Sequence, residues 1–276
     1  MIEHELSLRE IQDSSLQILK KIDAICVAEN LDYFVMYGTL IGTIRHKGFI
    51  PWDDDVDIMM PRADYNKLLS IIKSGTYENH NIKVLDTESN EKYPYMISRV
   101  IDPNYHVITD NEEDCGMGTF VDVYPLDNIA NSKLGALIKG RYYGWLSSLY
   151  FSSTRIKNPS SLNSAKGIVK TFSYYLSKAI GKKVLYKLLK NRSSTSNLTA
   201  NYIGCVEWMT NDFKRNIFRR ELLEGREVLP FESIQVKVPK NYHTILSDYY
   251  GDYMSLPSKK DRVPHHLYRA YEKNIE

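Results

Sequence analysis

The stretch Tyr37–Arg62 most constrains how this chain can fold, because it places four aspartates beside strongly apolar residues. It reads YGTLIGTIRHKGFIPWDDDVDIMMPR, and its acids are Asp53, Asp54, Asp55 and Asp57. Acidic and apolar side chains alternate from Asp55 to Met59, which predicts a β-strand with Asp55 and Asp57 on one face. We expect Val56 and Ile58 to be buried on the other face, so that the acids are held rigidly.

A second alternating segment, FVDVY at residues 120–124, predicts another strand with Asp122 as its single acid. Two carboxylates from one strand and a third from its neighbour can form an oxygen site for Mg²⁺, or for Mn²⁺. The competing interpretation is a solvated acidic turn, but the apolar residue behind each acid favours the metal site. The sequence therefore predicts a metal centre at Asp55, Asp57 and Asp122, while a pairing of Asp53 with Asp55 stays open.

A divalent ion beside three carboxylates is typical of phosphoryl-group chemistry, because it neutralises diphosphate oxygens. One carboxylate could instead accept a proton from an acceptor hydroxyl. The pair Gly38-Thr39 follows a predicted strand at residues 31–37 and opens a predicted helix. Backbone N–H groups and a hydroxyl would thus lie where a phosphate binds.

Several other residues could contact the substrate: Arg45, His46, Lys47, Trp52 and Arg99. The three consecutive basic residues could hold the donor phosphates, or they could form a solvated helix end, where cations are also favoured. Trp52 could pack against a substrate ring or a cationic head group, or belong to the core. Arg99 could reach a diphosphate or form a salt bridge to an acid.

The elements along the chain indicate an α+β fold. Helices are predicted at residues 4–30, 62–73 and 242–249, and strands at 83–86, 96–102, 105–109, 213–218, 228–231 and 234–238. Pro125 is expected to turn the chain after the second acidic strand. Three separated cysteines without zinc-type spacing, Cys26, Cys115 and Cys205, favour a reduced intracellular protein over a disulfide framework. The N-terminus resembles no signal peptide.

The charge distribution singles out the middle of the chain. Between Asn128 and Val206 there are thirteen Lys and Arg residues and no Asp or Glu, whereas the remainder holds 23 basic and 34 acidic residues, a net charge of −11. Residues 131–192 are helical in pattern and rich in aromatic side chains. This combination favours a basic helical insert that docks on an anionic membrane surface or holds an anionic lipid-linked substrate. Nucleic-acid binding is the alternative, and the acidic face argues against it.

With these residues assembled, the chain resembles the LicD family of phosphocholine transferases and their relatives in the nucleotidyltransferase superfamily. The likeness rests on three blocks: GTLIGTIRHKGFIPWDDDVDIMMPR, FVDVYPLD and YGDYMSLPSKKDRVPHH. It implies a nucleotidyltransferase-like core with a small mixed sheet flanked by helices. It also implies a Gly-Ser-like turn at Gly38-Thr39, paired acids at Asp55 and Asp57, and a third acid at Asp122. The third block suggests phosphate or acceptor binding by its closing residues, Arg262, His265 and His266.

The resemblance and the charge distribution together indicate three regions: a catalytic core at 1–130, the basic insert at 131–200, and a C-terminal part at 201–276 that completes the core. The implied reaction moves phosphocholine from CDP-choline, or a related CDP-alcohol, to a sugar hydroxyl and releases CMP. The expected acceptor is a lipid-linked precursor of teichoic acid or lipopolysaccharide, and the expected location is the cytoplasm, at the inner face of the plasma membrane. The alternatives are transfer of another phospho-alcohol, transfer of a nucleotidyl group, and a non-enzymatic, membrane-associated polymer-binding protein.

Overall fold

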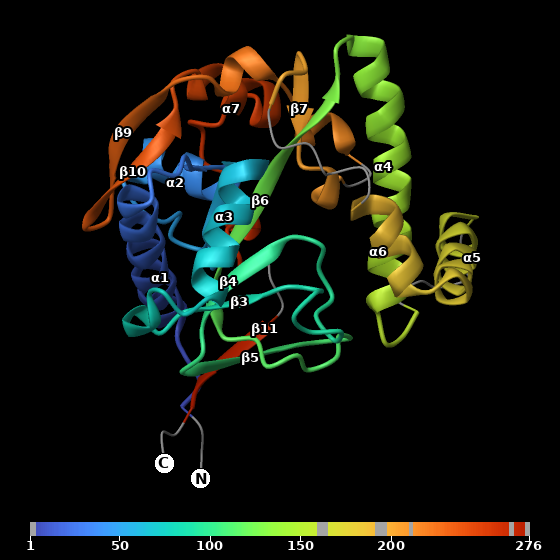
Figure 1. The fold of residues 1–276 in the computed structure, drawn as a ribbon, viewed down its shortest axis with the longest axis horizontal. Coiled ribbons are helices and arrows are strands. Elements are labelled where there is room, and N and C mark those ends of the chain that lie inside the picture. The colour runs from blue at the N-terminus through green and yellow to red at the C-terminus, as the bar shows by residue number, and fades with distance from the viewer. Residues whose placement is uncertain (1–3, 159–164, 191–197, 210–211, 265–267, 274–276) are drawn as a thin grey trace.

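A mixed sheet forms the centre of the computed structural model, which describes residues 4–158, 165–190, 198–209, 212–264 and 268–273 (Figure 1). Within these residues the strand order is β1-β2-β6-β4-β3, and β7 extends the far part of β6 and pairs with β8. The β2–β6 pair is parallel, whereas the other pairs are antiparallel. The strands are β1 (Phe34–Val35), β2 (Asp57–Pro61), β3 (Lys83–Leu85), β4 (Ser98–Asp102), β6 (Thr119–Ala130), β7 (Tyr202–Gly204) and β8 (Ile217–Arg219).

Helix α1 (Leu8–Ala28) packs against β6 and β4 through an apolar face. It begins where Ser7 and Glu10 form a capping box that satisfies free N–H groups of the first turn. Its buried face includes Ile18, Ile22 and Ile25, all fully buried in the main core. Helices α2 (Tyr37–His46), α3 (Arg62–Lys73) and α7 (Tyr242–Tyr250) also pack on this core.

Two further strand pairs lie beside the main sheet. The hairpin β9 (Arg226–Phe231) and β10 (Ile234–Pro239) contacts β1 and α2, and β5 (Tyr105–Thr109) pairs with β11 (Tyr268–Glu272). A bridge between Glu5 and Tyr271 brings the two ends of the chain together. Short 3₁₀ helices complete the structure: η1 (Glu78–His80), η2 (Val206–Trp208), η3 (Phe213–Asn216), η4 (Arg220–Leu223) and η5 (Lys259–Asp261).

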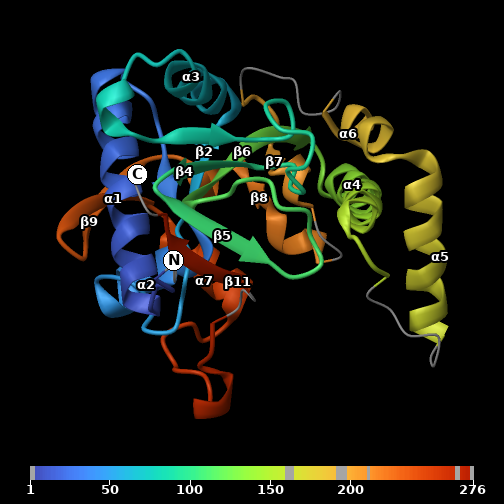
Figure 2. The same ribbon diagram turned by 90° about the horizontal axis from the view of Figure 1, so that it is seen from below.

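The basic middle of the chain forms three helices: α4 (Lys133–Thr154), α5 (Ala165–Ile180) and α6 (Lys182–Lys190). A second apolar core joins α4 and α6 to the end of β6 and to η2, with Tyr150 and Leu189 fully buried. Both views place α5 at the edge of the molecule opposite α1 (Figures 1 and 2). None of the helices in the described ranges combines the length and apolar character needed to cross a bilayer.

The structure confirms a mixed fold of helices and a mixed sheet, and it corrects several element boundaries. Asp55 precedes β2 rather than lying on it, because pairing with β6 begins at Asp57. The predicted turn at Pro125 is wrong: Pro125 lies opposite Met60, and β6 continues to Ala130, where β7 pairs with it. The first half of the predicted strand at 213–218 is η3, and β11 was not predicted.

Candidate active site

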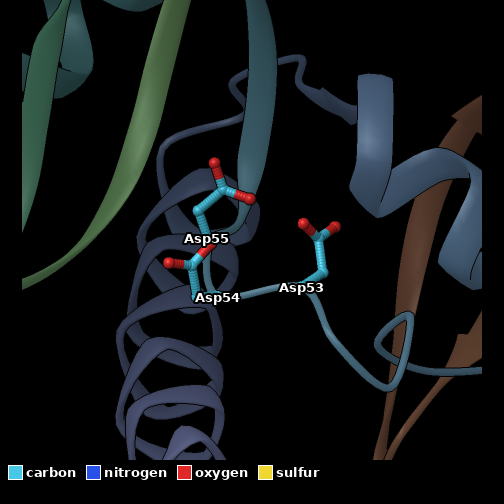
Figure 3. Close-up of side chains that lie close together, drawn as sticks. All are labelled: Asp53, Asp54 and Asp55. Atoms are coloured by element: carbon cyan, nitrogen blue, oxygen red, sulfur yellow. The ribbon is translucent and has the colours of Figure 1, made fainter. Parts of the chain in front are cut away.

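The parallel pairing of β2 and β6 places Asp57 directly opposite Asp122. Asp55 joins them from the loop before β2, and ligand atoms of the three carboxylates lie within 4.8 Å of one another. Asp53 and Asp54 form a second such group with Asp55. Figure 3 shows Asp53, Asp54 and Asp55 on the loop that leads into β2, with the carboxylates of Asp53 and Asp55 extending to the same side. The predicted triad is thus assembled, and Asp55 links it to the loop acids.

Backbone contacts hold Asp57 firmly. Its N–H donates to Thr39 Oγ1 over 2.9 Å, and its carbonyl accepts from the Met36 N–H over 3.0 Å. The neighbouring Val56 carbonyl accepts from the Asp122 N–H over 2.8 Å. Thr39 is buried, so its oxygen anchors the acidic strand to the first turn of α2. The sequence expectation of a phosphate contact by this hydroxyl stays a prediction.

All five aspartates of the two groups are buried, although carboxylates are seldom buried without compensation. Burial, followed by the charges of Asp55, Asp122 and Asp53, raises the pKa of Asp57 well above its ordinary value. Asp57 Oδ1 has no hydrogen-bond partner among the described residues. A buried oxygen without a partner amid like charges fits a bound divalent cation, because the cation would supply both the missing contact and the compensating charge.

Arg99 forms the ion pair that the sequence left open. Its Nε donates to Asp122 Oδ1 over 2.6 Å, and its Nη2 lies 3.3 Å from Asp122 Oδ2. The guanidinium lies over the rings of Phe120 and Tyr95, 3.8 and 4.2 Å from their centroids, and the residue is buried. Arg99 therefore orients Asp122 from behind, and it does not line the cleft described next.

A cleft of about 420 Å³ opens beside the acids. Three segments form it: the start of α2, the acidic loop, and the chain after α7. The third sequence block therefore meets the first one here. The lining residues are Gly38, Ile41, Arg45, Ile50, Trp52, Asp53, Asp55, Asp57, Tyr250, Asp252, Tyr253, Ser255, Leu256 and Pro257.

At Gly38, on the edge of this cleft, there is no room for a side chain unless the Asp53 carboxylate moves. A Cβ atom at that position would lie 2.5 Å from Oδ2 of Asp53, closer than real Cβ contacts allow. The preceding Tyr37 adopts a positive φ of 51°, which is strained for a tyrosine, and its hydroxyl donates to Asn216 Oδ1 over 2.8 Å. Such strain is often found where a chain must present functional groups.

The predicted basic residues line the other side of the cleft or lie near it. Arg45 Nη1 donates to the Tyr253 carbonyl over 2.9 Å, which ties α2 to the C-terminal segment. Arg262 lies over the Trp52 ring, 5.6 Å from its centroid, and donates to the Pro257 carbonyl. Burial, and then the nearby charge of Arg262, lowers the pKa of Arg45. Two cations close enough to repel each other form a suitable place for an anion such as a phosphate.

Of the remaining predicted substrate-binding residues, His46 is half-buried next to Arg45, whereas Lys47 is exposed at the end of α2. His46 accepts from Arg45 Nε over 2.9 Å and meets Trp52 edge-on, while burial and then Arg45 lower its pKa. Lys47 is exposed and ends α2 in the left-handed conformation. His265 and His266 lie outside the described residues.

Sequence reasoning missed two anchors of the acidic loop. Gln12, on the buried face of α1, donates to the Asp53 carbonyl over 2.8 Å. The Tyr268 hydroxyl of β11 donates to the Asp54 carbonyl over 2.8 Å. A glutamine among the mainly apolar buried residues of α1 was a usable signal, whereas nothing near Tyr268 indicated its partner.

Comparison with known proteins agrees with the sequence resemblance. Residues 30–145 match the family described as LicD/FKTN/FKRP, nucleotidyltransferase domain. The chain is 30% identical over 271 residues, 97% of its length, to the lipopolysaccharide cholinephosphotransferase LicD of Haemophilus influenzae, and the match spans 98% of that protein. An uncharacterized protein of Rickettsia typhi is 29% identical over 129 residues, which is 47% of this chain and 39% of the relative. Since one relative matches along almost its whole length, the chain belongs to the LicD family.

Proposed function

We propose that this protein transfers phosphocholine from CDP-choline to a sugar hydroxyl of a cell-surface glycan precursor and releases CMP. The observation that carries the proposal is the cleft lined by Asp55, Asp57 and Arg45, with Asp122 close to the two acids and Arg262 near Arg45. The full-length relative named a lipopolysaccharide cholinephosphotransferase supports the choice of group and acceptor. A lipopolysaccharide or a teichoic-acid precursor would supply the hydroxyl.

We further propose Mg²⁺, with Mn²⁺ as a substitute, held by Asp55, Asp57 and Asp122. Such an ion supplies charge neutralisation at the diphosphate. The fold around it would be the nucleotidyltransferase-like core of the superfamily. Arg99 holds the Asp122 carboxylate in its orientation, and Thr39 holds the backbone of Asp57 in place.

The remaining steps use the residues of this chain. Arg45 and Arg262 would bind the diphosphate on the side opposite the acids. The acceptor oxygen attacks the phosphorus that carries choline, the bond from that phosphorus to the bridging oxygen breaks, and CMP leaves with the bridging oxygen. A carboxylate facing the cleft accepts the hydroxyl proton. Trp52, Tyr250 and Tyr253 line the cleft and offer aromatic faces to the quaternary ammonium of choline.

The test is incubation of the purified protein with CDP-choline, Mg²⁺ and a lipopolysaccharide acceptor that lacks phosphocholine. We expect CMP release together with phosphocholine on the acceptor, measured by mass spectrometry. CMP found on the acceptor would instead indicate nucleotidyl transfer. If the protein used CDP-ribitol but not CDP-choline, the proposed donor would be wrong, while the proposed type of reaction would stand.

A further inference from the structure

The helical insert carries most of the exposed apolar side chains of the described structure. Eleven of the eighteen large hydrophobic residues that are exposed lie between residues 131 and 192, less than a quarter of the chain. They are Leu134, Ile138, Tyr142, Trp145, Ile156, Ile168, Val169, Phe172, Tyr175, Val184 and Leu188. A concentration of this kind marks an interaction surface rather than ordinary scatter.

On α4 these residues share one helix face. Leu134, Ile138 and Trp145 follow at four- and seven-residue intervals and are 69%, 63% and 53% exposed. The opposite face of α4, with Tyr143 and Leu146, is buried in the second core. Because its inner face already packs on the protein, the apolar outer face has to be explained by something outside it.

Helix α5 repeats the arrangement. Ile168, Phe172 and Tyr175 follow at intervals of four and three residues and are 55%, 67% and 64% exposed. Lys166 and Lys170 are exposed on the same helix, and each lies two residues from Ile168, which places both on the opposite side of the helix from this apolar stripe. An apolar stripe with lysines on the opposite side is the pattern of an amphipathic helix that lies in a membrane interface.

Two groups among the cations of the insert differ in their partners. Arg155, Lys183 and Lys190 pair with acids of the core, namely Glu112, Glu91 and Glu88. On α4 and α5, Lys139 and Lys178 donate to backbone carbonyls. The other four cations of these two helices form no ion pair with any residue of the described ranges: Lys133, Arg141, Lys166 and Lys170. The first group helps attach the insert to an acidic core, and the second group leaves a positive charge facing outward.

We propose that the outer insert face, formed by the exposed apolar and basic residues of α4 and α5, docks on a bilayer that contains anionic phospholipid. The apolar side chains would enter the boundary between head groups and acyl chains, while the cations contact lipid phosphates. This docking is independent of the group that the acidic cleft transfers.

Two other occupants fit the surface less well. A second copy of the chain would bring the same cations against themselves across a two-fold axis, so like charges would oppose each other. A nucleic acid would match the charge but would leave Ile168 and Phe172 without apolar partners. A bilayer satisfies both properties at once.

The place of the insert also suits a substrate presented at a membrane. Lys133 and Leu137 of α4 line a cavity of about 290 Å³ together with Tyr249 of α7. The next residue, Tyr250, lines the catalytic cleft. Docking through α4 would therefore hold the cleft near the membrane surface, where a lipid-linked acceptor would lie.

The test is co-sedimentation of the full chain with vesicles of phosphatidylcholine alone and of phosphatidylcholine with phosphatidylglycerol. We expect binding to the anionic vesicles that declines as salt is raised. The pair Lys166→Glu and Lys170→Glu should weaken partitioning by at least about 30-fold, and the pair Phe172→Ser and Tyr175→Ser by about tenfold. All four positions are exposed, so circular dichroism should report an intact fold.

Matched controls use exposed residues outside the insert. Lys83→Glu with Lys240→Glu makes the same change in net charge, and Val27→Ser with Val228→Ser replaces two apolar residues of similar fractional exposure. These controls should bind vesicles like the wild type. The proposal is overturned if the wild type ignores anionic vesicles or if controls and insert variants weaken equally. It is also overturned if soluble polyphosphate binds as tightly with no effect of the serine variants, or if sedimentation shows a dimer that the serine variants dissociate.

Discussion

The acidic cleft and the outer insert face both concentrate one sign of charge, but they do so in opposite surroundings. The aspartates of the cleft are buried against one another, whereas the cations of α4 and α5 are exposed to solvent. Buried like charges are costly, so the cleft calls for a cation within the protein. Exposed like charges cost little and call for an anionic partner outside it. Burial therefore separates the acids that we propose bind the metal from the cations that we propose bind the membrane.

The largest expected effect concerns Asp57. Asp57→Asn removes the charge of the carboxylate whose Oδ1 has no hydrogen-bond partner among the described residues, so CMP release should fall by at least about a thousandfold. The same change should leave thermal stability in the presence of a chelator unchanged or higher, because a repulsive buried charge is lost. The exposed Asp13→Asn on α1 is the control and should change neither quantity. Retained CMP release in Asp57→Asn would show that the Asp57 carboxylate is not needed for the reaction.

The second effect contrasts a buried ion pair with an exposed one. Arg99→Met leaves Asp122 buried without its partner and should cost about 3–5 kcal/mol in the free energy of unfolding by urea. Arg9→Met breaks exposed pairs with Asp13 and Glu232 and should cost less than about 1 kcal/mol. Equal losses in the free energy of unfolding would show that burial does not determine how much these ion pairs stabilise the protein.

Gly38→Ala probes how closely Asp53 is held. The added Cβ would displace the Asp53 carboxylate, and we expect CMP release to fall about 10- to 100-fold while the helix itself is little affected. Gly135→Ala in the first turn of α4 is the matched control, since its Cβ would meet only Ser132 Oγ and Ala130 Cβ, at 3.0 and 3.3 Å. A wild-type rate in Gly38→Ala would mean that the acidic loop tolerates movement.

The smallest expected effect is the pH dependence of stability and of metal binding. Because burial raises the pKa of Asp57, the folded protein without metal binds a proton more readily than the unfolded chain does. Its stability should therefore fall as pH rises from the ordinary aspartate range through the raised pKa. Metal binding should change in the opposite direction and weaken up to about tenfold per pH unit below that pKa. Thermal unfolding with and without Mg²⁺ across this range measures both trends, and the absence of an opposite trend would argue against Asp57 as a ligand.

Local patterns in the sequence were enough to predict the core of the site. The alternation around Asp57 and Asp122 predicted two strands, and their direct pairing followed from the fold. Asp55 could not be placed correctly, because the strand begins only where β6 supplies hydrogen bonds.

Contacts between segments far apart in the sequence could not be predicted from such local patterns. The hydrogen bonds of Gln12 and Tyr268 to the acidic loop join residues more than 40 positions apart and leave no periodic signal. Likewise, composition identified the insert as basic but did not divide its cations into those that pair with the core and those that face outward. That division needed the structure, because it depends on which helix face packs inward.

Calorimetric titration of Mg²⁺ and Mn²⁺ into the metal-free protein most directly tests the claim that the buried acids form a cation site. We expect saturable divalent-cation binding in the wild type, at the group that includes Asp57 and Asp122, and its loss in Asp57→Asn. Identical titrations for the two proteins, or a wild type that binds neither ion, would contradict the account.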